Sequence, residues 1–340
     1  MTSLSKLTLA AFAGVLLTGA AAQAQGTLER VKQRGQLLCG TSTGIAGFSI
    51  ADGQGNWSGL DVDVCRALSA AIFDDPGKIR FVPLASKDRL TALQTGEIDV
   101  LPRTTTWTLS RDAGQGLNFT AVNYYDGQGF QVRAKAGIKS VKELDGASIC
   151  TVQGTTNELN LADHFRVNKM KYEVVAFQGI DETVKAYESG RCDAISTDIS
   201  QLVSYRLKMA DAAEHVLLPE IISKEPIGPY VRQGDDEWFD IVRWTVFALI
   251  NAEELGVTQG NLAEMLKSDN PEVRRLLGVE GKFGAGLGLT PDWIARIVRH
   301  VGNYGESYEH NLGSGSRINL PRGLNNLWSR GGIQFAPPVR

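Results

Sequence analysis

Two consecutive series of strand-like and helix-like segments constrain the fold of this chain more than any other feature. The first series predicts strands at 36–39, 79–82 and 98–101, with helices at 61–73 and 87–95. The second predicts strands at 147–152, 172–177 and 192–196, with helices at 157–167, 182–189 and 199–209. Alternation of this kind favours a mostly parallel sheet covered by helices. The sequence therefore predicts an α/β protein made of two such lobes.

Two extended segments marked by Gly or Pro, at 127–133 and 225–232, predict a hinge of two strands between the lobes. We expect residues 25–128 and 225–340 to form lobe 1 and residues 129–224 to form lobe 2. Further helices are expected at 236–255, 262–266 and 291–301, with Pro291 in a first turn. The Gly-, Asn- and Pro-rich tail from Gly313 is expected to wrap over a surface. Ligands of open α/β sheets bind beyond the carboxyl ends of the strands, which places a site in the cleft.

The first 24 residues predict a secretory signal peptide, cleaved after Ala24. Lys6 is their single charge, a short apolar run follows, and the segment ends in small residues. The run is too short for a membrane span, which needs about 20 apolar residues. The alternative is a short buried helix at the true N-terminus. Export would place the mature protein in the periplasm, where disulfides form.

Composition excludes several classes of protein. The chain has 340 residues, with 35 Lys and Arg against 38 Asp and Glu, and a net charge of −3. Nucleic-acid binding needs a clustered basic surplus, so it is not expected. The four Cys form no C-x-x-C pair and the four His are scattered, so no metal site is expected. We favour pairing Cys39 with Cys65 and Cys150 with Cys192, because each pair falls within one lobe; the alternative is four buried free thiols.

Hydroxyl groups and an arginine follow the strand predicted at 98–101. Thr104, Thr106, Trp107 and Arg111 belong to this segment. An Arg fork can hold a carboxylate through two parallel hydrogen bonds, and Thr hydroxyls can add further donors. The alternative is a polar surface loop with a solvated arginine.

Two segments of the second series add complementary groups. Gly154, Thr155 and Thr156 open a helix, where backbone N–H groups are free for an anion; the alternative is a plain N-cap by one of the threonines. Asp198 begins another helix, where it can act as an N-cap or bind an ammonium group in the cleft. Anion donors opposite a carboxylate suit a zwitterion such as the backbone of a free amino acid.

The segment GLDVDVCRAL at 59–68 resembles the signature of family 3 solute-binding proteins, the periplasmic amino-acid receptors of ABC importers. The segment at 89–100 is similar to a helix–strand element of the same family. C-terminal segments at 303–306, 311–313 and 320–328 resemble the branch that serves general L-amino-acid importers. The resemblance covers essentially the whole mature chain. It implies the two-lobe periplasmic-binding-protein fold of type II.

This resemblance also implies roles for individual residues. Arg111 matches the arginine that pairs with the ligand α-carboxylate, and Asp198 matches the carboxylate that takes the α-ammonium. Donors to the carboxylate are implied at Thr104, Thr106 and Thr156.

Three positions depart from the family pattern. Ser42 falls near an often acidic position, Ile45 near an often aromatic one, and Ser86 where many members have an aromatic residue. This departure fits a roomier and less selective pocket, with Trp107 as one wall.

The expected function is binding of a free L-amino acid and delivery to the membrane permease of an ABC importer, by a monomer without cofactor. Two enzyme hypotheses compete with it. Ser42 lies in a G-x-S-x-G pattern at 40–44, but a helix must follow a hydrolase nucleophile and a turn-rich stretch follows here. A relative of the fold can also be a cyclohexadienyl dehydratase, whose catalytic residues the sequence does not reveal.

Overall fold

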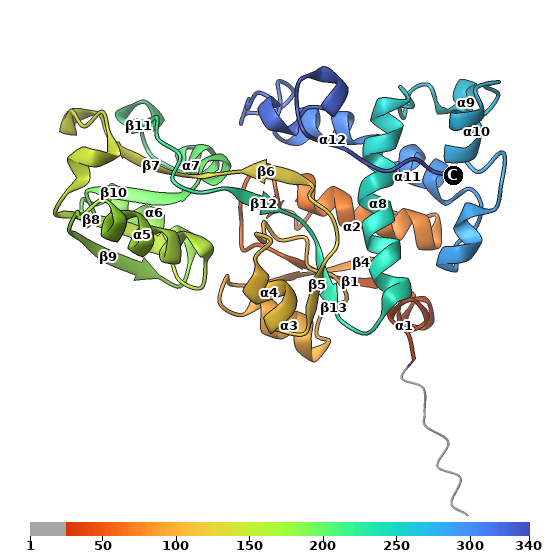
Figure 1. Ribbon diagram of the computed structural model, residues 1–340, viewed down its shortest axis with the longest axis horizontal. Helices are drawn as coiled ribbons and strands as arrows, with labels where there is room; N and C mark the ends of the chain where they lie inside the picture. Colours follow the sequence, from red (N-terminus) through yellow and green to blue (C-terminus); the bar gives the residue numbers. More distant parts are fainter. Residues whose placement is uncertain (1–24) are drawn as a thin grey trace, which may run out of the picture.

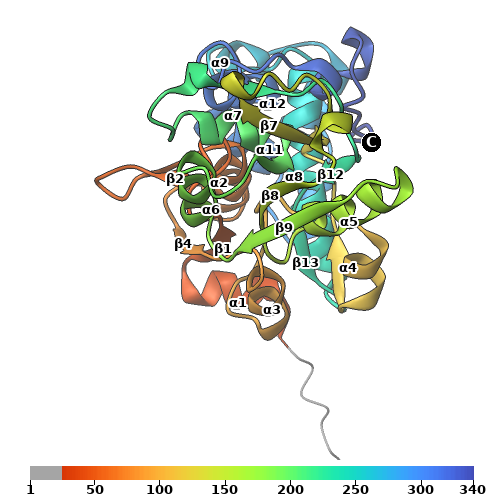
Figure 2. The ribbon, with the colours of Figure 1, turned by 90° about the vertical axis from the view of Figure 1, so that its left-hand side faces the viewer.

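The computed structural model describes residues 25–340, and the predicted signal peptide lies outside them. The described chain forms two lobes, with lobe 2 at the left of Figure 1 and lobe 1, with the C-terminal helices, at the right. Figure 2 shows the molecule from the side of lobe 2. Within residues 25–340, no helix is long and apolar enough to cross a membrane.

Lobe 2 is built on a mixed five-stranded sheet. Its order is β11 (His215–Leu217), β7 (Gln128–Arg133), β10 (Ala194–Asp198), β8 (Ala147–Val152) and β9 (Tyr172–Phe177). β10, β8 and β9 run parallel, whereas β7 is antiparallel to β10 and β11 is antiparallel to β7. The three expected strands of the second series are therefore confirmed, with the third shifted from 192–196 to 194–198.

Alternate residues of these strands face different helices, as the two-residue period of a strand requires. Ile149 and Ala194 pack with Leu161 and Phe165 of α5 (Thr156–Val167). The opposite face packs against α6 (Ile180–Glu188) and α7 (Ile199–Arg206).

Lobe 1 contains two pairs of strands that lie side by side. β1 (Leu37–Thr41) pairs in parallel with β4 (Ile79–Pro83), and β5 (Leu117–Phe119) pairs antiparallel with β13 (Tyr230–Arg232). Residues 98–101, expected as a strand, make only two isolated bridges, Cys39 to Val100 and Leu101 to Tyr230. These bridges join the two strand pairs. The helices of this part are α1 (Thr27–Arg34), α2 (Leu60–Phe73), α3 (Arg89–Thr95) and α4 (Leu109–Gly114), and β2 (Ile50–Ala51) and β3 (Trp57–Ser58) form a small hairpin.

Two short antiparallel strands run between the lobes (Figure 1). They are β6 (Tyr124–Asp126), which leads into β7, and β12 (Glu225–Ile227), which leads back to β13. Of the two segments expected as a hinge, 127–133 lies almost wholly in the lobe 2 sheet. The residues that span the lobes on that side precede it.

A helical layer covers lobe 1. Its members are α8 (Asp236–Glu254), α9 (Leu262–Met265), α10 (Pro271–Leu276), α11 (Trp293–Val301) and α12 (Tyr304–Asn311). α8 packs on α2, and the Trp238 indole N–H donates to the Asp99 carbonyl at 3.0 Å. The sequence did not predict α10 and α12, and α11 begins at Trp293, two residues after Pro291, which was expected in its first turn.

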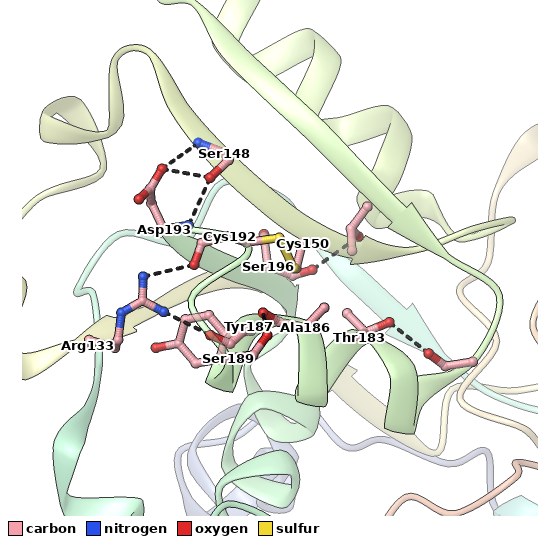
Figure 3. Close-up of a disulfide and its surroundings, with 12 residues drawn as sticks. Arg133, Ser148, Cys150, Thr183, Ala186, Tyr187, Ser189, Cys192, Asp193 and Ser196 are labelled. Atoms are coloured by element: carbon pink, nitrogen blue, oxygen red, sulfur yellow. Dashed lines mark hydrogen bonds between the residues drawn. A yellow bond between two sulfur atoms is a disulfide. The ribbon is translucent and has the colours of Figure 1, made fainter.

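Both expected disulfides are present, Cys39–Cys65 and Cys150–Cys192. The first joins β1 to α2. The second joins β8 to the segment that enters β10, as Figure 3 shows. Beside it, the Arg133 guanidinium donates to the carbonyls of Tyr187 and Cys192 at 2.8 and 2.9 Å. This region of lobe 2 is thus linked by covalent and polar contacts.

Candidate ligand-binding site

A small, largely enclosed polar cavity lies between the lobes, beyond the carboxyl ends of their strands. Five of the eight predicted site residues line it: Thr104, Thr106, Thr155, Thr156 and Asp198. The other lining residues are Ile45, Ser86, Arg89 and Arg103 of lobe 1 and Val152, Asn157, Ile180, Thr197, Gln201 and Tyr205 of lobe 2. Both lobes therefore contribute walls to one polar cavity.

The hydroxyl-rich loop of lobe 1 is held by a buried acid. Thr104 has a φ of 35°, in the left-handed region that side chains rarely adopt. Its N–H donates to Asp61 Oδ2 at 2.9 Å. Asp61 lies in the first turn of α2, and burial raises its pKa to about 7. α2 thus fixes the backbone that faces the cavity.

Two arginines from lobe 1 line the same wall. Arg103 donates through Nε to the Leu84 carbonyl at 2.8 Å, and burial lowers its pKa to about 10. Arg89, the first residue of α3, is 3% exposed and donates through Nη1 to the Arg103 carbonyl at 3.3 Å. Its Nε has no hydrogen-bond partner within the described residues. Burial, together with the like charges of Arg111 and Arg103, lowers the pKa of Arg89.

Thr155 and Thr156 begin α5 on the lobe 2 side. Thr155 is the N-cap, accepting from the Glu158 N–H at 3.4 Å and donating to the Val152 carbonyl at 2.7 Å. The Thr156 hydroxyl donates to Glu225 Oε2 at 2.9 Å and lies 3.3 Å from the Thr106 hydroxyl of lobe 1. The capping alternative therefore holds for Thr155, whereas Thr156 joins lobe 2 to lobe 1.

Asp198 ends β10 and occupies the N-cap position of α7, yet its side chain caps no N–H of that helix. Instead it accepts from Asn157 Nδ2 at 2.8 Å and from Gln201 Nε2 at 2.6 Å, at the cavity wall. Burial raises its pKa well above the usual range, and the carboxylates of Asp126 and Glu225 raise it further. A cation brought into the cavity would relieve this cost.

Three predicted site residues do not line the cavity. Trp107, expected as a wall, is 48% exposed, stacks on Phe119 and donates to Asp112 at 3.0 Å. Arg111 is 6% exposed, and its Nη1 donates to the Thr106 carbonyl at 2.9 Å, next to a residue that does line the cavity. Ser42 is buried, and its hydroxyl donates to the Ser49 carbonyl at 2.8 Å.

The contacts of Ser42 identify a structural role. Its Oγ also accepts from the N–H groups of Gly44 and Ile45, at 3.2 and 3.1 Å. Residues 45–49 close a tight turn through the Ile45–Ser49 bridge, so no helix follows Ser42 as a nucleophile elbow requires. The Ser42 hydroxyl is thus engaged in holding this turn.

Gly154 allows a close approach different from the expected one. A Cβ on this residue would lie 2.9 Å from Lys87 Cα, which belongs to lobe 1. The glycine therefore lets the lobes meet, rather than admitting a ligand.

Sequence reasoning missed Arg89 and Arg103 as site residues. The signal for Arg89 was its position after a strand. Ser86 and Arg89 follow β4, just as Thr104 follows residues 98–101, and ligands of α/β sheets bind beyond the strand ends. The sequence predicts a helix that includes Arg89, and the structure shows that the first residue of this helix also lines the cavity. Among the described residues, no cluster of His, Cys, Asp and Glu could hold a metal ion.

The model of the bacterial extracellular solute-binding proteins, family 3, matches residues 37–259. This chain belongs to that family. It is 55% identical over 336 residues to the "General L-amino acid-binding periplasmic protein AapJ" of Rhizobium johnstonii, covering 98% of each chain. It is 51% identical over 326 residues to the "Glutamate/glutamine/aspartate/asparagine-binding protein BztA" of Rhodobacter capsulatus, covering 96% of each.

A solved structure agrees with this placement. An ABC transporter periplasmic binding protein from Brucella ovis with glutathione bound is 56% identical and superposes with a TM-score of 0.91. The match covers 93% of this chain and 100% of that one. The two-lobe fold expected from the sequence is confirmed.

Proposed function

We propose that this protein is the periplasmic binding component of an ABC importer for L-amino acids. It binds one free amino acid between the lobes, closes on it and delivers it unchanged to a membrane permease. The protein is exported to the periplasm by a signal peptide that is then cleaved. It acts there as a monomer and catalyses no reaction. The names of the relatives support the class of solute, and the lining of the cavity supports the way it is held.

One observation carries this proposal: the two walls of a single cavity have opposite chemistry. The lobe 1 wall presents arginines and threonine hydroxyls, and the lobe 2 wall presents the Asp198 carboxylate. In our proposal Thr104, Thr106, Thr156 and Arg111 hold the α-carboxylate, and Asp198 accepts the α-ammonium. Arg111 donates through Nη1 to the Thr106 carbonyl. A guanidinium has five N–H donors, so further donors of Arg111 are available to the ligand carboxylate.

Arg89 indicates which side chains the site prefers. A zwitterion adds no net charge, yet Arg89 brings a buried cation with an unpartnered Nε into the cavity. Buried cations are stable when they are paired or fully hydrogen-bonded. We therefore propose that Arg89 binds the side-chain carboxylate or amide oxygen of acidic and amide amino acids, while Ile45 and Ser86 leave room for others.

A thermal-shift screen with the twenty amino acids tests the function. A ligand that binds only the native state raises the melting temperature with its concentration above Kd. We expect the largest shifts with L-glutamate, L-glutamine, L-aspartate and L-asparagine. Glutathione belongs in the screen because its γ-glutamyl end carries a free α-ammonium and α-carboxylate. No shift with any of these compounds would reject the proposal.

Two arginine substitutions separate the proposed roles. Arg111→Ala should abolish binding of all amino acids, because the α-carboxylate is common to them. Arg89→Ala should weaken L-glutamate by roughly 30-fold or more, since losing one partner of a buried charge pair costs about 2–5 kcal/mol. It should change L-alanine binding far less. Calorimetry with both ligands measures the difference, and equal losses would remove Arg89 from the side-chain role.

A further inference from the structure

Residues 313–340 form a C-terminal tail beyond the region that matches the family model. The tail contains two short 3₁₀ turns, Gly323–Asn325 and Trp328–Arg330. Its side chains hydrogen-bond to α8, α10 and the hinge strand β6, and its Pro321 carbonyl accepts from the Tyr308 hydroxyl of α12. The contact with β6 distinguishes this tail from a simple surface covering.

Asn325 pairs with the backbone of the hinge. Its Oδ1 accepts from the Tyr125 N–H at 2.6 Å, and its Nδ2 donates to the Tyr125 carbonyl at 3.0 Å. On the opposite edge of β6, the residue in register with Tyr125 is Pro226, which has no N–H. The Asn325 amide thus supplies both partners that a neighbouring strand would supply. It is buried, so these bonds are shielded from water.

Asn325 is in turn anchored to helix α8 of lobe 1. The Arg322 guanidinium makes a bidentate pair with Glu253 of α8, at 3.1 and 3.0 Å. The same guanidinium donates to the Asn325 carbonyl at 2.9 Å and lies over the rings of Tyr304 and Tyr308. Glu253 is 6% exposed, and bidentate charged pairs of this kind fix geometry well.

The residues just past Tyr125 belong to the other lobe. Asp126 accepts from the Ser200 hydroxyl of α7, and the Gly127 carbonyl accepts from the Ile199 N–H at 2.9 Å. Tyr125 is therefore held by the tail on the lobe 1 side, and Gly127 is held by lobe 2. The strand therefore connects a residue fixed to lobe 1 directly to residues fixed to lobe 2.

We infer that the C-terminal tail is a brace that fixes hinge strand β6 to helix α8 and so sets how easily the lobes close. The inference rests on the closing motion that is part of the proposed function. A braced strand restricts the open state to few conformations, so closure loses little conformational entropy. Without the brace the open ensemble widens, the binding-competent fraction falls and the apparent Kd rises in proportion.

Asn325→Ala tests the brace, and Asn326→Ala is its matched control. The Asn326 side chain bonds within the tail, to the Arg330 carbonyl and the Leu327 N–H. Spin labels on Lys78→Cys in lobe 1 and Glu173→Cys in lobe 2, both exposed, report the distance between the lobes. Without ligand, we expect Asn325→Ala to broaden the distance distribution and Asn326→Ala to leave it unchanged.

Calorimetry with L-glutamate gives the second measurement. We expect Asn325→Ala to raise Kd by roughly three- to tenfold, the net effect of about one hydrogen bond, and Asn326→Ala to leave Kd unchanged. Should Asn325→Ala fail to fold, Asn325→Asp keeps the shape and the bond from the Tyr125 N–H while losing the donor to its carbonyl. An unaltered distance distribution in a folded variant would overturn the brace. Failure of L-glutamate to bind the unaltered protein would instead reject the ligand class, and the distance measurement would still decide on the brace.

Discussion

The Asp198 carboxylate is buried. Its neighbours are the carboxylates of Asp126 and Glu225 and the neutral amide donors of Asn157 and Gln201. Its raised pKa means that the charged form of Asp198 is unfavourable in the ligand-free site. We predict that Asp198→Asn weakens L-glutamate binding by roughly 100-fold, because the ligand ammonium loses its counter-charge. The ligand-free variant should melt at the same or a higher temperature, since the asparagine carries no charge. Calorimetry and thermal melting measure the two effects.

Glutarate is the matched ligand control for this substitution, since it resembles L-glutamate without the amino group. Asp198→Asn should bind glutarate at least as well as the unaltered protein does. Equal losses of affinity for both ligands would show that Asp198 does not receive the ammonium.

A second prediction for a single residue concerns Gly154, where the two lobes come into contact. Gly154→Ala would place a Cβ 2.9 Å from Lys87 Cα across the cleft. We expect closure to become harder and the affinity for L-glutamate to fall by roughly five- to 100-fold, as overpacking costs about 1–3 kcal/mol. Gly146→Ala is the control, because Gly146 has a similar positive φ but nothing within 4 Å. Similar Kd values for the two variants would contradict a closure effect.

Among the elements, β8 pairs with β10, and the Cys150–Cys192 disulfide joins β8 to the segment that enters β10. We predict that the double change of Cys150 and Cys192 to alanine lowers the free energy of unfolding by about 2–4 kcal/mol. The same change at Cys39 and Cys65 should cost about 0.4 kcal/mol less in the chain-entropy account, because it closes a shorter loop. Urea unfolding measures both. A larger loss for the Cys39 pair would show that loop length does not decide the order.

The elements also show what sequence alone could predict. β8 and β9 match their expected bounds, because both contain β-branched residues, Ile149, Thr151 and Val152 in β8 and Val174 and Val175 in β9, and glycine-containing segments follow both. The segment at 98–101, Ile-Asp-Val-Leu, is also short and mostly apolar, but it makes only single bridges, to Cys39 of β1 and to Tyr230 of β13, which are far away in sequence. α12 was missed because its signal is a capping box, Asn303 with Glu306, rather than apolar periodicity.

The candidate site was partly predictable for the same physical reason. Thr104, Thr156 and Asp198 follow strand ends, so the sheet topology brings them together once the fold is known. The depth of a side chain in the cleft depends on tertiary packing. Sequence could therefore not place Arg89 inside the cavity and Trp107 outside it.

At the scale of the whole molecule, buried acids should govern the response of stability to pH. Burial raises the pKa of Asp61 to about 7 and of Asp126 to about 6, above the unfolded value of 3.8. At Asp61 and Asp126 the native state therefore binds more protons than the unfolded state between about pH 4 and pH 7. Stability then falls as pH rises, and we expect the ligand-free protein to melt at a lower temperature at about pH 7.5 than at about pH 5.

Asp61 allows this prediction to be tested with one substitution. Asp61→Asn still accepts from the Thr104 N–H. Asn123 Nδ2 donates to Asp61 Oδ1 at 3.4 Å, and turning the Asn123 amide over would let its Oδ1, which has no partner among the described residues, accept from the new amide instead. We expect the variant to be more stable than the unaltered protein at about pH 7.5, with a flatter dependence between pH 5 and pH 7.5.

The control for Asp61→Asn is Asp52→Asn. Hydrogen bonds from Asn56 and Gln54 lower the pKa of the exposed Asp52 carboxyl, so this group stays charged in both states throughout that range. Its substitution should leave the slope intact. An unchanged slope in Asp61→Asn, measured by urea unfolding at each pH, would mean that Asp61 is ionised in the folded protein. The pH dependence would then be expected from Asp126 of β6, and Asp126→Asn would be the variant that flattens it.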